Sequence, residues 1–273
     1  MLFLKHVPEG PLSDFVEYLW LVRDAPSHAM ERILPAGTLE LVINLHEDEL
    51  RVYDDAGACR SLSGTIISGA YGRPFLIDTR EHALTMGVHF RPGGAFPFSV
   101  APPGELGDAH VDVESLWGNA AVETLRDRLG SARTHLERFQ ILERALAPRA
   151  RDARKARPVV QLALRGLADP RASVRELVAS SGFSHRHFTN VFREDVGVAP
   201  KLFSRIRRFQ RAITLGTERP FGSFARLAAE CGYGDQGHLI RDFAAFARAT
   251  PAGYFMHAKP VVKDHHVALL GSD

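Results

Sequence analysis

The 273-residue chain predicts an α+β protein, with a small β-barrel or sandwich and helices first, then an all-α domain of two helix-turn-helix units joined by a long helix. Three observations lead to this fold: a change of charge near residue 150, short alternating strands before it, and an internal repeat after it. The expected units are a β-rich domain at 1–150, a helical domain at 151–257 and a tail at 258–273.

The composition is that of a globular protein with a buried core. It has 45% hydrophobic, 24% charged and 9% aromatic residues, which excludes a disordered, collagen-like or coiled-coil chain. Cys59 and Cys231 have no Cys or His neighbour at metal-ligand spacing, so we expect both to pack, with no metal and no cofactor. Apolar runs are short and the N-terminus lacks a signal peptide, so we expect a cytoplasmic protein with no membrane partner.

The charge is divided unevenly along the chain. Residues 1–150 carry 14 basic and 21 acidic side chains, a net charge of −7, whereas residues 151–257 carry 18 basic and 9 acidic ones, a net charge of +9. Sixteen of those 18 basic residues are arginine, whose planar fork matches phosphate and guanine edges. The basic half therefore suggests a polyanionic partner. The alternative is a GC-rich genome with charges on solvated helices.

The basic half contains a repeat at an offset of 50 to 51 residues, a period typical of a duplicated supersecondary unit. Each copy predicts a short helix with a serine cap, Ser173 or Ser223, and with apolar residues at i, i+3 and i+4. Gly182 or Gly232 then reverses the chain into a second helix. The predicted segments are a first helix-turn-helix at 173–199, a connecting helix at 200–215 and a second helix-turn-helix at 223–250.

The second helix of each copy buries a pair of apolar residues spaced i, i+4, Phe188 with Phe192 and Leu239 with Phe243. In a helix-turn-helix this helix enters the major groove of DNA, where Gln suits adenine and Arg suits guanine. Each outward residue has the alternative of being a solvated surface residue. The candidate base contacts are Arg186, Thr189, Asn190, Gln236, His238 and Arg241, with Ile240 and Asp242 also placed on the outer surface.

A connecting helix is predicted between the copies. Pro200 suits a first helical turn, and Leu202, Ile206, Phe209 and Ile213 form one apolar stripe. Such a rod would hold two recognition helices about one DNA turn, ~34 Å, apart, so that one chain reads two successive major grooves. The candidate contacts to the DNA backbone are Ser184, Arg193, Arg205 and Arg208.

These motifs resemble the DNA-binding domain of the AraC/XylS family of bacterial transcription regulators. The resemblance is carried by L-V-A-S-S-G-F-S-H-R-H-F-T-N-V-F and G-V-A-P in the first unit, and by L-A-A-E-C-G-Y-G-D-Q-G-H-L-I-R-D-F and A-T-P-A-G-Y-F in the second. It implies sequence-specific binding of double-stranded DNA, and RNA polymerase as a partner if the protein is an activator. The base-reading positions of the family fall on the six candidate residues given above.

Three positions depart from the family pattern. Gly234, Ala244 and Arg248 stand where the family usually has a serine, a basic residue and a glycine. The first change is expected to weaken the cap of the second recognition helix, which opens at Gly234 or Asp235. The second removes a phosphate contact, and the third puts the end of that helix in question. We therefore expect weaker DNA binding by the second unit.

Residues 1–107 predict short strands separated by turns, the clearest at 39–45, 65–68, 75–79 and 84–90. In the last of these, apolar and polar residues alternate, so its polar face either lines a pocket or is half-solvated. Two helices are expected, near 120–129 and 136–146. The second carries the stripe Leu136, Phe139, Leu142 and Leu146, which either packs on the barrel or pairs with a second subunit.

The acidic half is similar to the N-terminal domains of one group of AraC-type regulators. The similarity lies in the segments R-I-L-P-A-G-T-L-E-L-V-I-N and G-V-H-F-R-P-G-G-A-F-P-F. Such domains are often small-molecule sensors or dimerisation modules, so the resemblance implies a small-molecule effector or a homodimer. The candidate residues of a polar ligand site are Trp20, Glu40, Asn44, Arg73, His89 and Arg91.

The sequence favours a sequence-specific transcription regulator without enzymatic activity. A cupin-like enzyme fused to a DNA-binding module would need more strand ligands than His82 and His89. A DNA-repair methyltransferase would need reactive or zinc-binding cysteines, and Cys59 stands alone. A non-specific nucleoid protein would bind through charge, and its affinity would fall steeply with salt.

Overall fold

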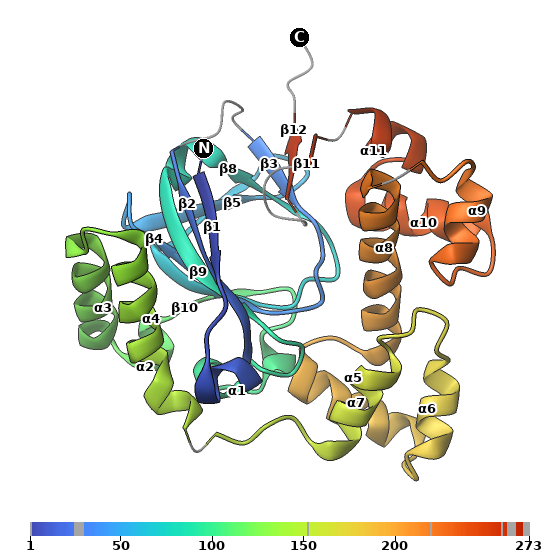
Figure 1. Cartoon of the computed structure of the whole chain (residues 1–273), viewed down its shortest axis with the longest axis horizontal. Coiled ribbons are helices and arrows are strands. Elements are labelled where there is room, and N and C mark those ends of the chain that lie inside the picture. The colour runs from blue at the N-terminus through green and yellow to red at the C-terminus, as the bar shows by residue number, and fades with distance from the viewer. Residues whose placement is uncertain are drawn as a thin grey trace.

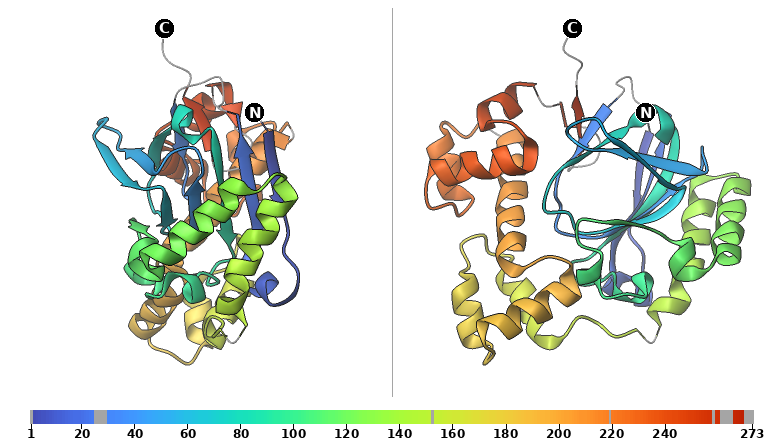
Figure 2. Two further views of the ribbon diagram at one scale, coloured as in Figure 1. Left: turned by 90° about the vertical axis from the view of Figure 1, so that its left-hand side faces the viewer. Right: turned by 180° about the vertical axis from the view of Figure 1, so that it is seen from behind.

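The computed structural model describes residues 2–24, 30–151, 153–218, 220–257, 259–260 and 266–269. The fold is α+β as predicted, with a sandwich of two open sheets and a helical half (Figure 1). Helices α3 (Asn119–Ser131) and α4 (His135–Ala150) lie on one side of the sandwich, and the C-terminal helices lie on the opposite side (Figures 1 and 2). The sandwich therefore separates the predicted pair of helices from the repeat.

Each sheet has six strands within the described residues. The first has the order β1-β2-β9-β4-β7-β10, and the second the order β11-β12-β3-β8-β5-β6. The bounds in the first sheet are β1 Leu2–His6, β2 Val16–Arg23, β4 Glu40–Asn44, β7 Thr65–Ser68, β9 Leu84–Phe90 and β10 His110–Asp112. Those in the second are β3 Met30–Ile33, β5 Glu49–Tyr53, β6 Cys59–Ser63, β8 Phe75–Asp78, β11 Lys259–Pro260 and β12 His266–Leu269.

Two strands come from the last residues of the chain. Strand β12 pairs antiparallel with β3, with Val267 opposite Arg32, and β11 pairs with β12. The segment 258–273, expected as a tail, thus contributes two strands at the edge of a sheet whose other strands lie in the first third of the chain.

Strand β9 is buried on both faces. Met86, Val88 and Phe90 are fully buried in the main core, and Thr85 and His89 on the alternate face are 2% and 8% exposed. A half-solvated strand is therefore the wrong alternative.

The predicted stripe on α4 needs one correction. Phe139, Leu142 and Leu146 belong to the same core as β9, whereas Leu136 is 58% exposed. Most of the stripe thus packs on the sandwich side, and only its first residue is left on the surface.

The helical half follows the repeat. The first unit is α6 (Val174–Ser180) and α7 (His185–Val196), and the second is α9 (Phe224–Glu230) and α10 (Gln236–Ala247). Ser173 and Ser223 cap their helices as predicted, each accepting a backbone N–H three residues later. Gly182 and Gly232 take the left-handed conformation, with φ of 74° and 78°, that reverses the chain between the two helices of each unit. Helix α5 (Pro158–Gly166) precedes the units and α11 (Pro251–His257) follows them.

The connecting helix α8 (Pro200–Glu218) joins two hydrophobic cores. Phe203 lies in the core that the sandwich shares with the first unit, whereas Ile206, Phe209 and Ile213 lie in the core of the second unit. Leu34, which follows β3, is 2% exposed and belongs to the second core. A residue of the sandwich thus completes the core of a helix-turn-helix.

Polar contacts join the second unit to the sandwich at the same place. Nε2 of Gln210 on α8 donates a hydrogen bond of 2.6 Å to the carbonyl oxygen of Pro35. Arg248, after α10, donates through Nε to Asp55 at 2.7 Å. These contacts hold α8 and the end of α10 against the sandwich.

Asp195 ties the start of α5 to the end of α7. The carboxylate is 3% exposed and accepts from the backbone N–H of Arg157 at 2.7 Å and from its guanidinium at 2.8 Å (Nη2) and 3.1 Å (Nε). The same guanidinium also donates to Glu194 at 2.7 Å, and these hydrogen bonds raise the pKa of Arg157. A buried carboxylate with this many charge-assisted partners is a strong structural contact.

Replacing Asp195 should destabilise the protein more than replacing its neighbour. We expect Asp195→Asn to lower the free energy of unfolding by about 3 kcal/mol, because it breaks a buried ion pair. Glu194→Gln, whose side chain is 54% exposed, should cost less than about 1 kcal/mol. Urea unfolding of both variants tests this. Equal losses of unfolding free energy would show that burial does not strengthen the contacts of Asp195.

The two cysteines differ in their environments. Cys231 is buried in the core of the second unit, as expected for a packing residue, but Cys59 in β6 is exposed. The prediction of a packing role is therefore wrong for Cys59, because among the described strands β6 pairs with β5 alone, at the edge of its sheet, and leaves that position open.

Candidate nucleic-acid interface

The first recognition helix, α7, presents a polar face to solvent. Ser184 caps it by accepting the backbone N–H of His187 at 3.3 Å. Phe188 and Phe192 are 2% and 0% exposed, so the helix is packed as predicted. The outward face consequently exposes the predicted residues Arg186, Asn190 and Arg193.

Thr189 is less open than the other predicted base contacts. It is partly buried, and its Oγ1 is buried without a hydrogen-bond partner within the described residues. It lines a groove between α7 and α8 together with Lys201, Ser204 and Arg208. Its contact with a base remains a prediction, and its position beside α8 is what the structure adds.

The second recognition helix, α10, is capped by a residue other than the family serine. Asp235 accepts the backbone N–H of His238 at 2.8 Å, and this hydrogen bond is the main cause that lowers the pKa of the Asp235 carboxyl. Gly234 therefore does not leave the helix without a cap, and the expectation of a weakened cap is wrong. The extra residue of the second copy places Asp235 where the serine is missing.

The outer face of α10 is also polar. Leu239 and Phe243 are fully buried, which leaves Gln236, His238 and Arg241 exposed, with Ile240 beside them. The His238 ring lies 3.0 Å from Asp235 through Nδ1. These positions match the predicted base-reading face in exposure.

Asp242 is a correction to that face. It is 5% exposed and accepts from Arg205 on α8 at 3.0 Å (Nε) and 2.7 Å (Nη2). The Arg205 guanidinium also lies 5.1 Å from the ring centroid of Phe246. Arg205, predicted to contact the DNA backbone, is thus held by α10, and its contact with phosphate remains a prediction.

The other departures have local explanations. Arg248 ends α10 with a φ of 55°, the left-handed conformation that favours glycine, which is the family residue at this position. Ala244 is exposed.

Arg208, predicted to contact the DNA backbone, is half-buried and lines the same groove as Thr189. Its guanidinium lies 5.4 Å from the ring centroid of Tyr233, and burial raises the pKa of Tyr233.

The structure brings together three of the six residues predicted for a ligand site. Trp20 and Glu40 line a pocket inside the sandwich. His89 lies beside Glu40, with its Nδ1 2.7 Å from Oε1 of that carboxylate, and its ring is stacked on Tyr18. These three residues therefore lie close together, although the pocket itself is mainly apolar.

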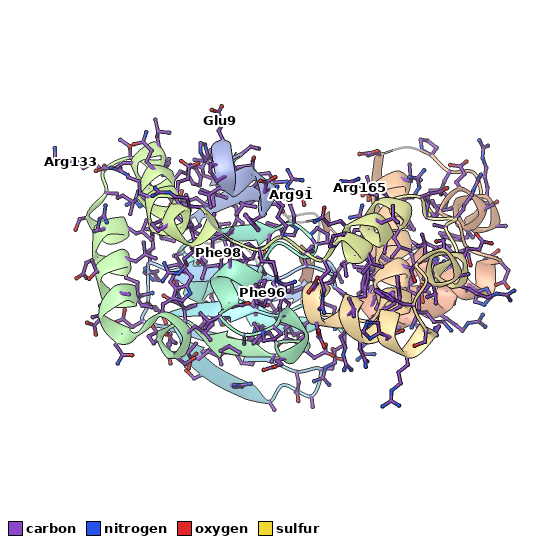
Figure 3. The ribbon with its side chains drawn as sticks, turned by 90° about the horizontal axis from the view of Figure 1, so that it is seen from below. Glu9, Arg91, Phe96, Phe98, Arg133 and Arg165 are labelled. Carbon is purple, nitrogen blue, oxygen red and sulfur yellow. The ribbon has the colours of Figure 1, made fainter. Side chains whose placement is uncertain are left out.

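The other three lie elsewhere. Asn44 holds a turn, because its Nδ2 donates to the carbonyl oxygen of Glu49 and its Oδ1 accepts the backbone N–H of His46. Arg73 is exposed on the loop before β8. Arg91 donates to the carbonyl oxygen of Ser13 and, with Arg165 on α5, lines a cleft between the sandwich and helices α5 and α8 (Figure 3). Placing these three in one site with Trp20 is therefore wrong.

Two pocket residues had no signal in the sequence. Tyr71 lies in a loop and His110 in the three-residue strand β10. A strand so short shows no alternation, and only the pairing of β10 with β7 places His110 over the pocket.

The described part of the chain contains no helix that is long and apolar enough to cross a membrane. Nor do its His, Cys, Asp and Glu side chains form a group of three or more that could hold a metal ion.

The double repeat, with two exposed polar recognition faces on one connecting helix, defines a helix-turn-helix DNA-binding protein. Residues 177–257 match a family described as a helix-turn-helix domain, and residues 4–112 match a domain of unknown function, DUF6597. The resemblance to the AraC/XylS family of transcription regulators that was predicted from the sequence is thereby confirmed. The chain is a DNA-binding transcription regulator.

Structural comparison matches ToxT from Vibrio cholerae. A 1.65 Å structure of ToxT has 9% identity and a TM-score of 0.45, with 93% of this chain and 98% of that chain covered. A structure of wild-type ToxT with bound unsaturated fatty acid has 9% identity and a TM-score of 0.44, with 93% and 95% covered. Among curated proteins, none matches this sequence.

Removing Arg205 should destabilise the second unit. Arg205→Ala leaves the buried Asp242 carboxylate without this partner, so we expect a loss of about 1–3 kcal/mol in the free energy of unfolding. Arg207→Ala is the matched control, because Arg207 is exposed on the same helix and should change stability by less than about 0.5 kcal/mol. Urea unfolding separates the two, and an unchanged midpoint for Arg205→Ala would contradict a structural role for the pair.

Proposed function

We propose that this regulator recognises a specific DNA sequence by inserting α7 and α10 into two successive major grooves on one face of the duplex. The observation that carries the proposal is that both recognition helices pack on one connecting helix of 19 residues, about 28 Å long at 1.5 Å per residue. That length is close to one DNA turn of ~34 Å. A single rigid helix therefore suits two adjacent grooves.

The exposed side chains support base reading by both units. Arg186 and Asn190 on α7, and Gln236 and Arg241 on α10, are exposed side chains of the types that pair with guanine and adenine edges. The net charge of +9 over residues 151–257 adds attraction to phosphate that is independent of sequence. Base reading then selects the site, and charge strengthens binding to it.

The acidic half modulates this activity in the proposed function. It binds a small-molecule effector or makes a homodimer, and RNA polymerase is a further partner if the protein activates transcription. Leu34 and the Gln210–Pro35 hydrogen bond join this half directly to α8. A structural change in the sandwich is therefore transmitted to α8, the helix that positions α7 and α10.

Selection of genomic fragments by the full-length protein near physiological salt, followed by footprinting of the best fragment, tests the proposal. We expect two protected major-groove segments about one turn, ~34 Å, apart for each chain. One protected segment would show that only one unit reads bases. Binding without any preferred fragment, which salt weakens steeply, would favour charge-only binding and overturn the proposal.

Removing one proposed base-contacting side chain from each unit should weaken binding to the selected site. We expect Arg186→Ala and Arg241→Ala each to cost about 1–3 kcal/mol on that site and to relax specificity at one base pair. Arg144→Ala, an exposed arginine on α4, is the control and should leave the affinity unchanged. Fluorescence anisotropy with the site and its single-base variants measures this; unchanged affinity in both variants would contradict the assignment of the recognition faces.

A further inference from the structure

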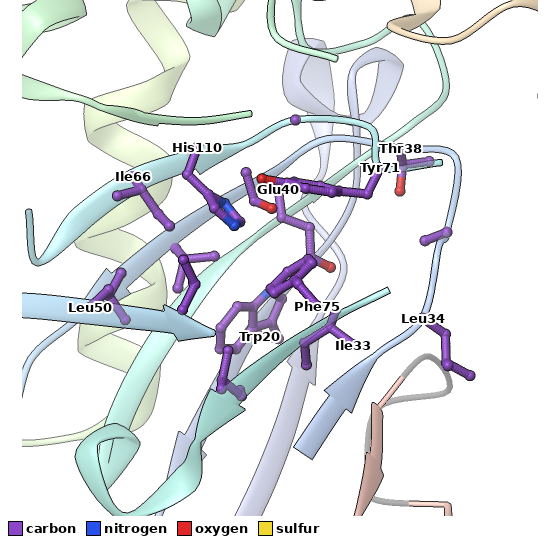
Figure 4. Close-up of a pocket in the computed structure, with 16 residues that line it drawn as sticks. Trp20, Ile33, Leu34, Thr38, Glu40, Leu50, Ile66, Tyr71, Phe75 and His110 are labelled. Atoms are coloured by element: carbon purple, nitrogen blue, oxygen red, sulfur yellow. The ribbon is translucent and has the colours of Figure 1, made fainter. Parts of the chain in front are cut away.

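A pocket lies between the two sheets of the sandwich (Figure 4). Its walls come from both sheets and from the segment 34–38 that follows β3. The cavity measures about 80 Å³, which limits it to a ligand of few atoms. Much of the lining is aliphatic: Ile33, Val42, Leu50, Val52, Ile66 and Ile77.

Flat rings line two sides of the pocket. Trp20 lies over Gly87, where a Cβ atom would stand only 2.6 Å from Cζ2 of the indole, so the glycine makes room for the ring. Tyr71, Phe75 and His110 form a second cluster, with ring centroids 4.7 to 4.8 Å apart. An aromatic ligand suits such walls, because aromatic rings attract one another in stacked and edge-on arrangements.

A row of polar side chains crosses the first sheet beneath the pocket. His110 on β10 is opposite Ser68 on β7, Ser68 is opposite Glu40 on β4, and Glu40 is opposite His89 on β9. Residues in register on neighbouring strands project from the same face. The first three of them line the pocket, and Figure 4 shows His110 and Glu40 converging in it.

His110 is the polar group most suited to a ligand. It is 6% exposed, and its Nδ1 is buried with no hydrogen-bond partner among the described residues. Burial, and to a smaller extent Arg60, lowers the pKa of His110 to about 4, so the ring is neutral at physiological pH. A neutral imidazole offers Nδ1 as a donor or an acceptor, according to its tautomer, and a buried nitrogen without a partner is costly.

The charge of the pocket favours an uncharged ligand. No lysine or arginine occurs among the described residues that line it, and its one acidic residue, Glu40, lies against His89 at 2.7 Å. Arg60 and Arg73 act on His110 and Tyr71 from outside the lining, so a carboxylate ligand would meet no arginine within the cavity itself, and loss of its water there is unfavourable. A neutral ligand with one polar group meets no such penalty.

The segment 34–38 connects this pocket to the connecting helix. Leu34, Ala36 and Thr38 line the pocket. Within the same five residues, Leu34 enters the core of the second unit and Pro35 accepts the hydrogen bond from Gln210 on α8. A ligand that presses on this segment therefore changes the surface on which α8 rests.

We propose that this pocket binds a small, uncharged, mainly aromatic molecule that hydrogen-bonds to Nδ1 of His110, and that its occupancy alters DNA binding through the segment 34–38. The second clause rests on the proposed function, whereas the first does not. The ligand class follows from the shape, the rings and the missing cation of the cavity.

Benzamide and benzoate are the probes, because they share a shape and differ in charge. With the full-length protein, calorimetric titration should give one benzamide site per chain with a Kd of about 1–10 mM, the range expected for nine non-hydrogen atoms. Benzoate should bind at least ~10-fold more weakly, because it must desolvate its charge. Absence of benzamide binding at ~30 mM, far above that range, or equal affinity for benzoate, would overturn the proposed ligand class.

Two variants locate the site. His110→Phe keeps a ring in the cluster but removes Nδ1, and should weaken benzamide binding ~5-fold or more, as expected for loss of a buried hydrogen bond. Val52→Phe fills the pocket from its partly exposed β5 wall and should abolish binding. His46→Phe, at an exposed position, is the matched control and should bind normally. Unchanged benzamide affinity in both pocket variants would overturn the site.

The coupling is measured separately with the DNA site found by selection. Saturating benzamide should change the affinity of the wild-type protein for that DNA site by ~5-fold or more, a usual size for coupling between sites. It should not change the affinity of Val52→Phe. Gln210→Ala should still bind benzamide yet show a smaller effect on DNA. Benzamide binding without any effect on DNA would overturn the coupling alone. If no DNA site is selected, the proposed function fails while the titrations still decide the pocket.

Discussion

The apolar stripe of α8 packs against three parts of the protein at once. Its first turns bury Phe203 in the core of the sandwich and first unit, and its later turns bury Ile206 and Phe209 in the core of the second unit. Leu34 of the sandwich is buried in that second core as well. Because close-packed cores transmit rather than absorb displacements, the positions of α7, α10 and the sandwich depend on this one helix.

Two buried ion pairs also orient the recognition helices within that packing. Arg205 holds Asp242 on α10, and Arg157 holds Asp195 at the end of α7. Each pair fixes the rotation of a recognition helix about its own axis, because a buried carboxylate must meet its partner. The face that each helix shows to solvent is therefore set by contacts on the opposite side, where no base is touched.

The helical half could be predicted because its signals are local. A serine cap, a left-handed glycine and an i, i+4 apolar pair lie within a few residues of one another, and the repeat presents them twice. Exposure of Arg186, Asn190, Gln236 and Arg241 followed from those pairs. The burial of Asp242 did not, since it depends on Arg205, 37 residues away in the chain.

The ligand-site residues could be predicted only in part, because their neighbours come from distant strands. Trp20 and Glu40 were both predicted for one polar site, and the structure places both in the lining of the pocket. Arg91 shares the polarity expected of a site but lines a different cleft, and Arg73, on the loop between Tyr71 and Phe75, is exposed and is not part of the pocket lining. His110 reaches it only through the pairing of β10 with β7, a contact that no local pattern encodes.

The pairing of β12 with β3 has a consequence for the synthesis of the protein. Strand β3 lies near residue 30, and its partner begins at His266, so this edge of the sheet is completed only after residues 266–269 have left the ribosome. Until then the backbone N–H and C=O groups along that edge of β3 lack this partner, the situation in which strands pair with the wrong chain. Strand β12 thus covers an edge formed early, and a protein cut after α11 would leave that edge of β3 uncovered.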